Sequence, residues 1–388
     1  MSEHRVPEPD YAVKPSFGGG ALGIMKESIR ASLRELTNLI GVTGDEREVV
    51  KYLRDKFIPV ADQVDVSTIG NLVAVKKGSG PGPKLLLVAH SDEVGYTVKS
   101  ILNNGFLIFE KIGIPPDKVM PGRKVWINTN KGRVPGIIGI KPAHMQSPEE
   151  LKKVHTTDEL YIDVASASKE ETTDMGIRTG DRVAIQSEFM EMANRDYICA
   201  RAIDNRVSCS VLLQLFEELG KTDFAGTVYA AMTVHEESGF TGGKVIGGII
   251  EPDYAIVLDT IPAADTPDSD PQRQSTWLGK GPACPLDYGI ANGVYFHYIH
   301  PKVKEIIEKA SENTGIPIQY TTILEAGYLT EAPFISAGYK GIPTGTLSVP
   351  RRYSHSPVEL MNLNDAAGLV KILLEIIGSN SSLSFDFI

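Results

Sequence analysis

The stretch Lys84-Leu-Leu-Leu-Val-Ala-His90 indicates the fold class of this 388-residue chain. It is a continuous apolar run, with Pro83 before it and the polar pair Ser91-Asp92 after it. A strand of this kind has no polar face, so we expect it inside a sheet that helices cover on both sides. Ligands of open α/β sheets bind beyond the carboxyl ends of the strands. His90 and Asp92 therefore stand where a functional site is expected.

The rest of the pattern divides the chain into three regions. Residues 23–94 and 193–388 combine helical periodicity with apolar strands, so we expect one α/β domain with a mixed central sheet flanked by helices. Residues 95–192 carry short β-type runs between turn signals such as Asn103-Asn-Gly105, which is typical of a small barrel or sandwich. We expect this region to be an inserted β domain. Residues 1–22, rich in Pro and Gly near the start, are expected to be a flexible lead-in.

One local motif concerns the start of a helix. Thr43-Gly-Asp-Glu46 has the spacing of a capping box, in which the Thr and Glu side chains each accept a hydrogen bond from the other residue's backbone. The motif predicts a helix that follows Thr43 and runs through Phe57.

Composition narrows the class of protein. Hydrophobic residues make up 42% of the chain and charged residues 23%, the profile of a soluble globular protein. The net charge of −10 argues against a nucleic-acid partner, because such proteins usually carry a basic face. Cys199, Cys209 and Cys284 form no C-x-x-C pair, so we expect neither disulfides nor a thiolate zinc site. The chain shows no secretory signal and no apolar run of ~18 residues, so we expect a cytoplasmic protein without a membrane partner.

Acidic and histidine side chains follow apolar strands or begin loops at five separate places. These places are Ala89-His-Ser-Asp92, Arg201-Ala-Ile-Asp204, Thr233-Val-His-Glu236-Glu237, Ala255-Ile-Val-Leu-Asp259 and Tyr353-Ser-His355. Each has an ordinary alternative, such as a solvated loop, a turn-forming Asp259 or a helix cap at Asp204. For Glu236 and Glu237 the alternative is a pair of solvated acids in a loop. A functional role is favoured if they are buried, because a buried pair of adjacent carboxylates needs a cation or proton between them.

Together these side chains suffice for two metal ions. The candidate ligands are His90, Asp204, Glu237, Asp259 and His355. If Asp204 bridges, each ion receives three protein ligands and keeps an open position, as catalytic zinc sites do. Two such ions can activate water and polarise a carbonyl, and Glu236 would remain free as general base. Asp92 could orient His90. No H-E-x-x-H, G-x-S-x-G, Walker A or strand-linked G-x-G-x-x-G motif competes with this interpretation.

The ordered set of motifs resembles that of the tetrahedral (TET) aminopeptidases. The matching motifs are His90-x-Asp92, Asp204-Asn-Arg206, Glu236-Glu237, Asp259 and Tyr353-Ser-His355-Ser-Pro357. Members of this family are co-catalytic zinc or cobalt exopeptidases of the glutamyl and leucyl type, and some were formerly described as endoglucanases. The likeness covers nearly the whole chain from about Ser28, including non-catalytic stretches such as Glu159-Leu-Tyr-Ile-Asp163.

The resemblance implies a fold, an assembly and residue roles. The fold would be of the phosphorylase/hydrolase-like, zinc-exopeptidase type, with a small β-barrel insert that makes dimer contacts. Dimers would assemble into a hollow tetrahedral dodecamer that admits short peptides. One metal ion would be held by His90 and Asp259 and the other by Glu237 and His355, with Asp204 bridging. The same resemblance makes Glu236 the base, gives Asp92 the task of orienting His90, and favours zinc, with cobalt or manganese as alternatives.

Two loops depart from the pattern of the family. Ser238-Gly-Phe-Thr-Gly-Gly243 replaces a common Val-Gly-Leu-Arg-Gly-Ala, and Gly327-Tyr-Leu-Thr-Glu-Ala332 replaces a Gly-Thr-Asp-Ala stretch. The second loop lies near the substrate in relatives, so both loops bear on substrate preference. The expected function is a metal-dependent aminopeptidase that releases N-terminal residues from short peptides. The alternatives are a related two-metal amidase or deacylase, a glycoside hydrolase, and a non-catalytic oligomeric scaffold.

Overall fold

The buried strand expected around Leu85 is β3 (Gly80–His90), and it lies inside a twelve-stranded mixed sheet. The computed structural model describes residues 20–270, 274–290, 295–324, 327–338 and 340–380, with residues 383 and 385. The helices are α1 (Ala21–Asn38), α2 (Arg47–Phe57), α3 (Lys169–Asp174), α4 (Ile203–Leu219), α5 (Thr241–Ile250), α6 (Pro301–Thr314), α7 (Ala332–Ser336) and α8 (Leu363–Gly378). Short 3₁₀ turns span Asp117–Val119, Ala143–Met145, Glu150–Lys152 and Thr157–Glu159.

The large sheet runs through the order β1-β2-β12-β3-β13-β17-β18-β11-β10, and β14 to β16 extend from β17. Besides β3, its strands are β1 (Gln63–Val66), β2 (Leu72–Lys77), β10 (Met190–Glu191), β11 (Tyr197–Ala200), β12 (Ala225–Thr233), β13 (Tyr254–Pro262), β14 (Ala283–Gly289), β15 (Phe296–Tyr298), β16 (Gln319–Ile323), β17 (Thr344–Arg352) and β18 (Glu359–Asn362). The four central strands β12, β3, β13 and β17 are parallel to one another. Their carboxyl ends therefore meet at one edge of the sheet, and this edge carries the candidate site.

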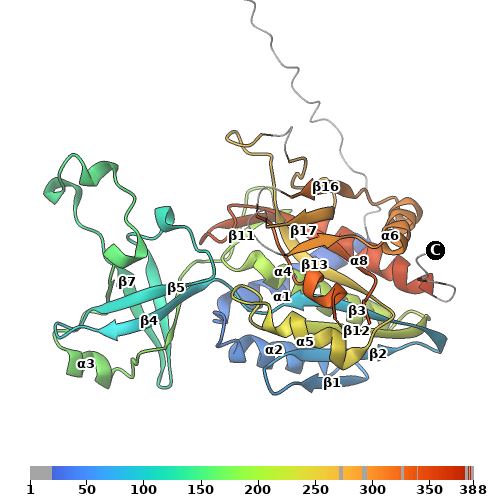
Figure 1. Ribbon diagram of the computed structural model, residues 1–388, viewed down its shortest axis with the longest axis horizontal. Helices are drawn as coiled ribbons and strands as arrows, with labels where there is room; N and C mark the ends of the chain where they lie inside the picture. Colours follow the sequence, from blue (N-terminus) through green and yellow to red (C-terminus); the bar gives the residue numbers. More distant parts are fainter. Residues whose placement is uncertain are drawn as a thin grey trace, which may run out of the picture.

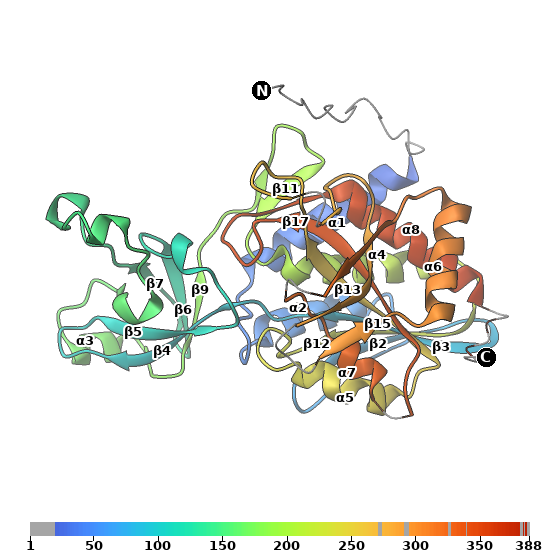
Figure 2. The same cartoon turned by 45° about the horizontal axis from the view of Figure 1, so that its top comes forward.

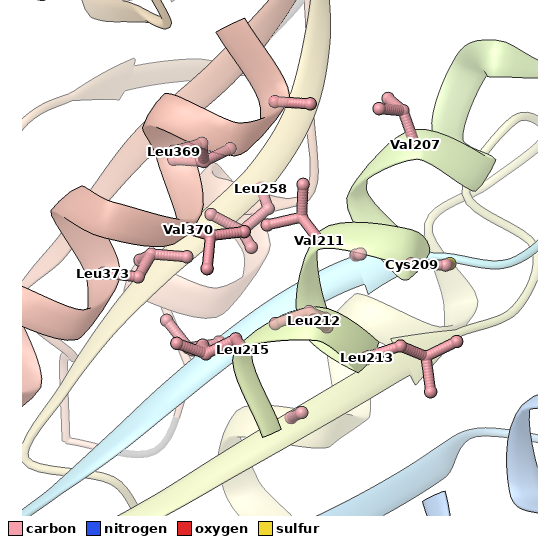
Figure 3. Packing of buried hydrophobic residues seen from close by; sticks show 14 of the residues in the cluster. Val207, Cys209, Val211, Leu212, Leu213, Leu215, Leu258, Leu369, Val370 and Leu373 are labelled. Atoms are coloured by element: carbon pink, nitrogen blue, oxygen red, sulfur yellow. The ribbon is translucent and has the colours of Figure 1, made fainter. Parts of the chain in front are cut away.

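Helices cover both faces of the central strands. Along β3, Leu85 and Leu87 pack into one core with α1, α2, α4 and α8, whereas Leu86 and Val88 face a second core with α5 and α7. Figure 3 shows part of the first core, with side chains of α4 and α8 packed over Leu258 of β13. The sequence prediction of a strand buried on both faces is confirmed, since Leu85 to His90 are all buried.

Residues between β3 and β10 form a closed six-stranded barrel. Its order is β4-β5-β8-β7-β6-β9, with all neighbouring strands antiparallel. The strands are β4 (Gly95–Ile101), β5 (Leu107–Ile112), β6 (Lys124–Thr129), β7 (Gly132–Ile138), β8 (Ile162–Asp163) and β9 (Arg182–Ile185). The barrel lies at one end of the molecule, beside the α/β part, in both Figure 1 and Figure 2. The expected fold class, a mixed sheet with helices and a small inserted barrel, is confirmed.

The capping box at Thr43 is a wrong prediction. α2 begins at Arg47, and its cap residue Glu46 makes no side-chain cap. The Glu46 carboxylate instead accepts hydrogen bonds from the backbone N–H groups of Gly44 at 2.9 Å and His235 at 3.2 Å. Thr43 Oγ1 donates to Asp92 Oδ2 at 2.8 Å. Thr43 thus bonds to Asp92 and Glu46 to Gly44 and His235, and neither side chain makes the expected reciprocal cap.

Two further expectations concern the N-terminal lead-in and the absence of a membrane partner. The predicted lead-in lies mostly outside the described residues, and α1 already begins at Ala21. Within the described part of the chain, every helix is too short or too polar to span a membrane.

We predict that Phe216→Ala destabilises the α/β core by about 3–5 kcal/mol, because it leaves a cavity where a whole ring was buried. Phe216 is fully buried and meets Phe57 edge to face, with ring centroids 5.2 Å apart. Urea denaturation followed by circular dichroism measures the change. Ile249→Ala on α5, where the side chain is exposed, serves as the control and should shift stability by no more than about 0.5 kcal/mol. Equal denaturation midpoints for the two variants would contradict the prediction.

Candidate metal centre

The parallel strands bring the side chains of the five predicted places together. His90 is the last residue of β3, Asp259 lies in β13, and Glu236 and Glu237 follow the end of β12. Asp204 lies at the start of α4, and His355 lies in the turn between β17 and β18. Three groups of metal-capable side chains result, each with one donor atom per residue and all donors within 4.8 Å of one another. The groups are His90-Asp204-Asp259, Asp204-Glu237-His355 and His90-Glu236-Glu237.

Donor atoms in the first two groups have the spacing of metal ligands. His90 Nε2 lies 3.2 Å from Asp204 Oδ1 and 3.7 Å from Asp259 Oδ1. His355 Nε2 lies 3.3 Å from Asp204 Oδ2 and 3.5 Å from Glu237 Oε2. Tetrahedral zinc with bonds of 2.0–2.1 Å separates its ligand atoms by roughly 3.3 Å. Asp204 turns one carboxylate oxygen toward each histidine, which is the orientation that a bridging ligand needs.

The helix-cap alternative for Asp204 is wrong. The cap position of α4 is Ala202, and no side chain caps the helix there. Asp204 and Asn205 have non-helical backbone angles inside the helix boundaries. Among the hydrogen bonds of the described residues, none runs from a helix N–H to the Asp204 carboxylate, whose oxygens face His90 and His355 and bind Arg351.

Asp92 is fully buried, and His90 is only one of several groups that it contacts. Its Oδ1 lies 3.5 Å from His90 Nδ1, which is too long for a strong hydrogen bond. The same carboxylate accepts hydrogen bonds from the backbone N–H groups of Glu236 at 3.0 Å and Glu237 at 3.1 Å, and from Thr43. Asp92 thus holds the backbone of the two glutamates as well as facing the histidine.

Burial and crowding raise the proton affinity of Glu236 and Glu237. Burial, reinforced by Glu237 and Asp259 and opposed by His90, raises the pKa of Glu236 well above its ordinary value. Burial likewise raises the pKa of Glu237 to about 8. Although burial works in the opposite direction, Glu237 and Asp204 raise the pKa of His355 to about 9. Such a cluster binds protons strongly because it holds more negative charge than its own cations balance.

The cluster fits divalent cations. Oε1 of Glu237 is buried and has no hydrogen-bond partner, so a donor atom is available there. Imidazole and carboxylate are donors that suit zinc, and they also serve cobalt and manganese. The residues that could hold two ions are His90, Asp204 and Asp259 on one side, and Asp204, Glu237 and His355 on the other.

Sequence reasoning missed two buried charges that contact the cluster. Arg351 Nη2 is bound to Asp204 Oδ2, and its Nε donates to Thr260 Oγ1 at 2.6 Å. Glu359 accepts hydrogen bonds from the backbone N–H groups of Asp204 at 3.0 Å and His355 at 2.7 Å. Their positions gave a signal, since Arg351 stands four residues before His355 and Glu359 is the one acid in an apolar run around Leu360.

A cavity of about 310 Å³ opens beside the cluster. It is lined by the ligand candidates and by an apolar wall of Ile114, Phe240, Ile290, Ile323, Tyr328 and Leu329. Phe240 and Tyr328 belong to the two loops in which the sequence departs from the family pattern. A Cβ on Gly242, in the first of these loops, would come within 2.6 Å of the Val234 carbonyl oxygen, so only glycine fits there.

The remaining described histidines lie outside the three metal-capable groups. His297 is buried, and its ring stacks at a tilt against Tyr288, with centroids 5.1 Å apart. His235 has a left-handed backbone with φ of 61° and faces Glu46 at 3.7 Å. His4 lies outside the described residues.

Known proteins that are similar to this chain include aminopeptidases. A model described as M42 glutamyl aminopeptidase matches residues 70–372. A protein of Acetivibrio thermocellus provisionally named an aminopeptidase is 33% identical over 89% of this chain and 97% of its own length. The lysyl aminopeptidase of Pyrococcus furiosus is 28% identical over 88% of this chain and 94% of its own length.

Solved structures share the whole fold. The TET aminopeptidase of the marine sediment archaeon Thaumarchaeota archaeon SCGC AB-539-E09 superposes with a TM-score of 0.85 and is 30% identical, covering 92% of this chain and 97% of that one. The TET1 peptidase of Pyrococcus horikoshii, which can assemble into a tetrahedron or a large octahedral shell, has a TM-score of 0.80 and 29% identity, covering 90% and 99%. With a family match over most of its length, this chain belongs to the M42 glutamyl aminopeptidase family of metallo-aminopeptidases, which hydrolyse peptide bonds.

Proposed function

We propose that this protein releases N-terminal residues from short peptides at a pair of divalent metal ions. The observation that carries the proposal is the Asp204 carboxylate, which faces His90 with one oxygen and His355 with the other. In this proposal His90 and Asp259 complete one metal position, and Glu237 and His355 complete the other. Bound ions supply the Lewis acidity that polarises the scissile carbonyl and activates water.

Glu236 is the proposed general base. Its Oε2 lies 3.9 Å from His90 Nε2, beside the cluster, and its backbone is held by Asp92. A carboxylate at this distance can take the proton of the attacking water and return it to the leaving amine nitrogen.

The cavity favours an uncharged N-terminal side chain. Ile290, Ile323 and Leu329 line its wall among the described residues. Apolar surface of this kind binds apolar side chains by removing both from water. A two-metal amidase or deacylase would use the same ligands and differs only in accepting substrates without a free amine. Glycoside hydrolysis needs a carboxylate pair flanking a sugar and no metal, and the family membership disfavours it.

We further propose that the barrel mediates self-association into dimers and larger closed shells. The support is twofold: the Pyrococcus horikoshii relative forms such shells, and the barrel carries exposed apolar side chains. These side chains are Ile137, Ile140, Met145, Leu151 and Val154. Apolar patches of this kind mark protein interfaces. We also place the protein in a reducing compartment such as the cytoplasm, because all three cysteines are buried and unpaired.

We predict that Glu236→Gln lowers kcat by about 10²–10⁴-fold while metal content stays constant, because the amide cannot accept the proton. Glu237→Gln is the matched comparison. It removes a proposed ligand and should lower the bound metal below two ions per chain. Aminopeptidase turnover and metal analysis of the dialysed proteins measure both effects. If Glu236→Gln kept wild-type turnover, the role of Glu236 as base would be wrong.

We predict that a chelator abolishes activity and that zinc, cobalt or manganese restores it. A panel of chromogenic aminoacyl substrates, assayed with each metal, also reports the preferred residue, which we expect to be apolar. The control is the preferred substrate with its amine acetylated. Hydrolysis of the acetylated substrate at a similar rate would favour the amidase alternative, and activity that persists in chelator would contradict both proposals.

We predict that Ile140→Asp reduces the mass of the assembly, because a carboxylate buried in an apolar interface without a partner is strongly unfavourable. Light scattering coupled to size-exclusion chromatography measures the mass. Ile58→Asp, just after α2 and equally exposed, is the control and should leave the mass unchanged. An unchanged mass for Ile140→Asp would argue against an interface at this part of the barrel.

A further inference from the structure

A permanent cation of the protein lies inside the candidate metal centre. Arg351 is only 4% exposed, although its side chain is long and charged. Its Nη2 is bound to Asp204 Oδ2, and its Nε donates to Thr260 Oγ1. Its Nη1 lies 3.6 Å from Glu359 Oε1 and has no hydrogen-bond partner. A guanidinium group stays protonated in proteins, so this charge is present at every working pH.

Arg351 approaches one side of the shared carboxylate. It binds Oδ2 of Asp204, which is the oxygen that also faces His355 Nε2 at 3.3 Å. The other oxygen, Oδ1, faces His90 Nε2 at 3.2 Å, and the hydrogen bond of the arginine goes to Oδ2 instead. The guanidinium therefore binds the Asp204 oxygen that belongs to the group Asp204-Glu237-His355. The oxygen that belongs to the group His90-Asp204-Asp259 is the other one.

This contact has two consequences for a bound dication. A hydrogen bond from the guanidinium to Oδ2 occupies a lone pair and reduces the charge that this oxygen offers to a metal ion. The positive charge of Arg351 also repels a second cation in a buried site, where screening by water is weak. The repulsion acts on both groups, since Arg351 interacts electrostatically with Asp259 as well as with Glu237. The hydrogen bond acts only on the Asp204 oxygen that faces His355, and this difference distinguishes the two groups.

The positive charge of Arg351 also offsets negative charge that a metal ion would otherwise balance. Asp204, Glu237 and Glu359 are three buried carboxylates within this part of the site. Arg351 is bound to Asp204 Oδ2 and lies 3.6 Å from Glu359 Oε1, so its charge offsets part of the negative charge of these carboxylates. The group Asp204-Glu237-His355 therefore has part of its negative charge offset by Arg351. It needs a bound metal ion less than the group His90-Asp204-Asp259 does.

We propose that Arg351 makes the two metal positions unequal. The group His90-Asp204-Asp259 holds its ion tightly, and the group Asp204-Glu237-His355 holds its ion weakly because Arg351 competes for Asp204 Oδ2. This inference rests on the proposed function, in which both groups bind metal. Arg351 acts through Asp204 and is a positioning residue.

The neighbouring Arg352 provides a matched control. It is the next residue in β17, and its guanidinium makes two hydrogen bonds to Asp265, at 2.7 and 2.8 Å. Asp265 belongs to none of the three metal-capable groups. Replacing Arg352 removes one positive charge from the same strand without touching Asp204. An effect specific to Arg351 is thus separated from a general change in charge.

The test is a titration of the full-length, chelator-stripped protein with Zn²⁺ by calorimetry, with metal analysis after dialysis. We expect the wild type to bind two ions whose dissociation constants differ at least tenfold. Arg351→Met should tighten the weaker site roughly 10–100-fold. Replacing a group that supports a metal ligand weakens binding by about this factor, and we expect the opposite sign here because Arg351 competes with the ion. The tighter site should change little, and Arg352→Met should match the wild type.

Two further variants keep the test decisive. Arg351→Gln retains a hydrogen-bond donor without charge, and Arg351→Lys retains the charge. If Arg351→Met does not fold, these two decide: Arg351→Gln must bind the second ion more tightly than Arg351→Lys. Equal affinities in that pair, two equal sites in the wild type, or an Arg351→Met variant with an unchanged or weaker second site would overturn the inference. Protein that binds no Zn²⁺ at all would instead refute the proposed function.

Discussion

The Asp92 carboxylate is the contact on which the candidate centre depends. It is fully buried, and three donors from two other loops converge on it: Thr43 Oγ1 and the backbone N–H groups of Glu236 and Glu237. Hydrogen bonds to a charged acceptor in a buried place are stronger than neutral ones. Asp92 therefore ties the end of β3 to the end of β12, and it fixes the backbone from which two adjacent, mutually repelling carboxylates project.

The parallel strands explain why motifs far apart in the sequence could be assigned to one metal site. The apolar run before His90 and the acids after β12 are local signals, because burial and strand ends leave a visible trace in the sequence. Parallel neighbours then bring those ends to one edge, so side chains 265 positions apart, such as His90 and His355, become neighbours. Strand order left no such trace. β4 and the strands β14 to β16 were not predicted, since they alternate weakly and depend on pairing with distant strands for their stability.

The errors and omissions have a common physical cause. Thr43 and Glu46 have the spacing of a helix cap, yet Asp92 and the His235 backbone take their side chains, because buried partners in the tertiary structure compete successfully with a local cap. Arg351 and Glu359 were missed for a related reason. Their local positions give a signal but do not identify the partner of either charge, since Asp204 lies about 150 positions away in the sequence. Charge balance is a property of the assembled site and not of any segment.

That balance connects stability to function. Glu236, Glu237 and Asp259 all have pKa values raised mainly by burial, so the fold confines ionised groups at an energetic cost. A protein that needed only stability would gain by replacing such a cluster with apolar side chains of similar volume. Local rules are broken in this way where chemistry requires it. Arg351 hydrogen-bonds the Asp204 oxygen that faces His355, so we expect the His90 side to depend more on a bound cation. The asymmetry of the shared carboxylate follows from the fold, because His90 ends β3, whereas Arg351 in β17 and His355 in the turn after it approach the other oxygen of Asp204.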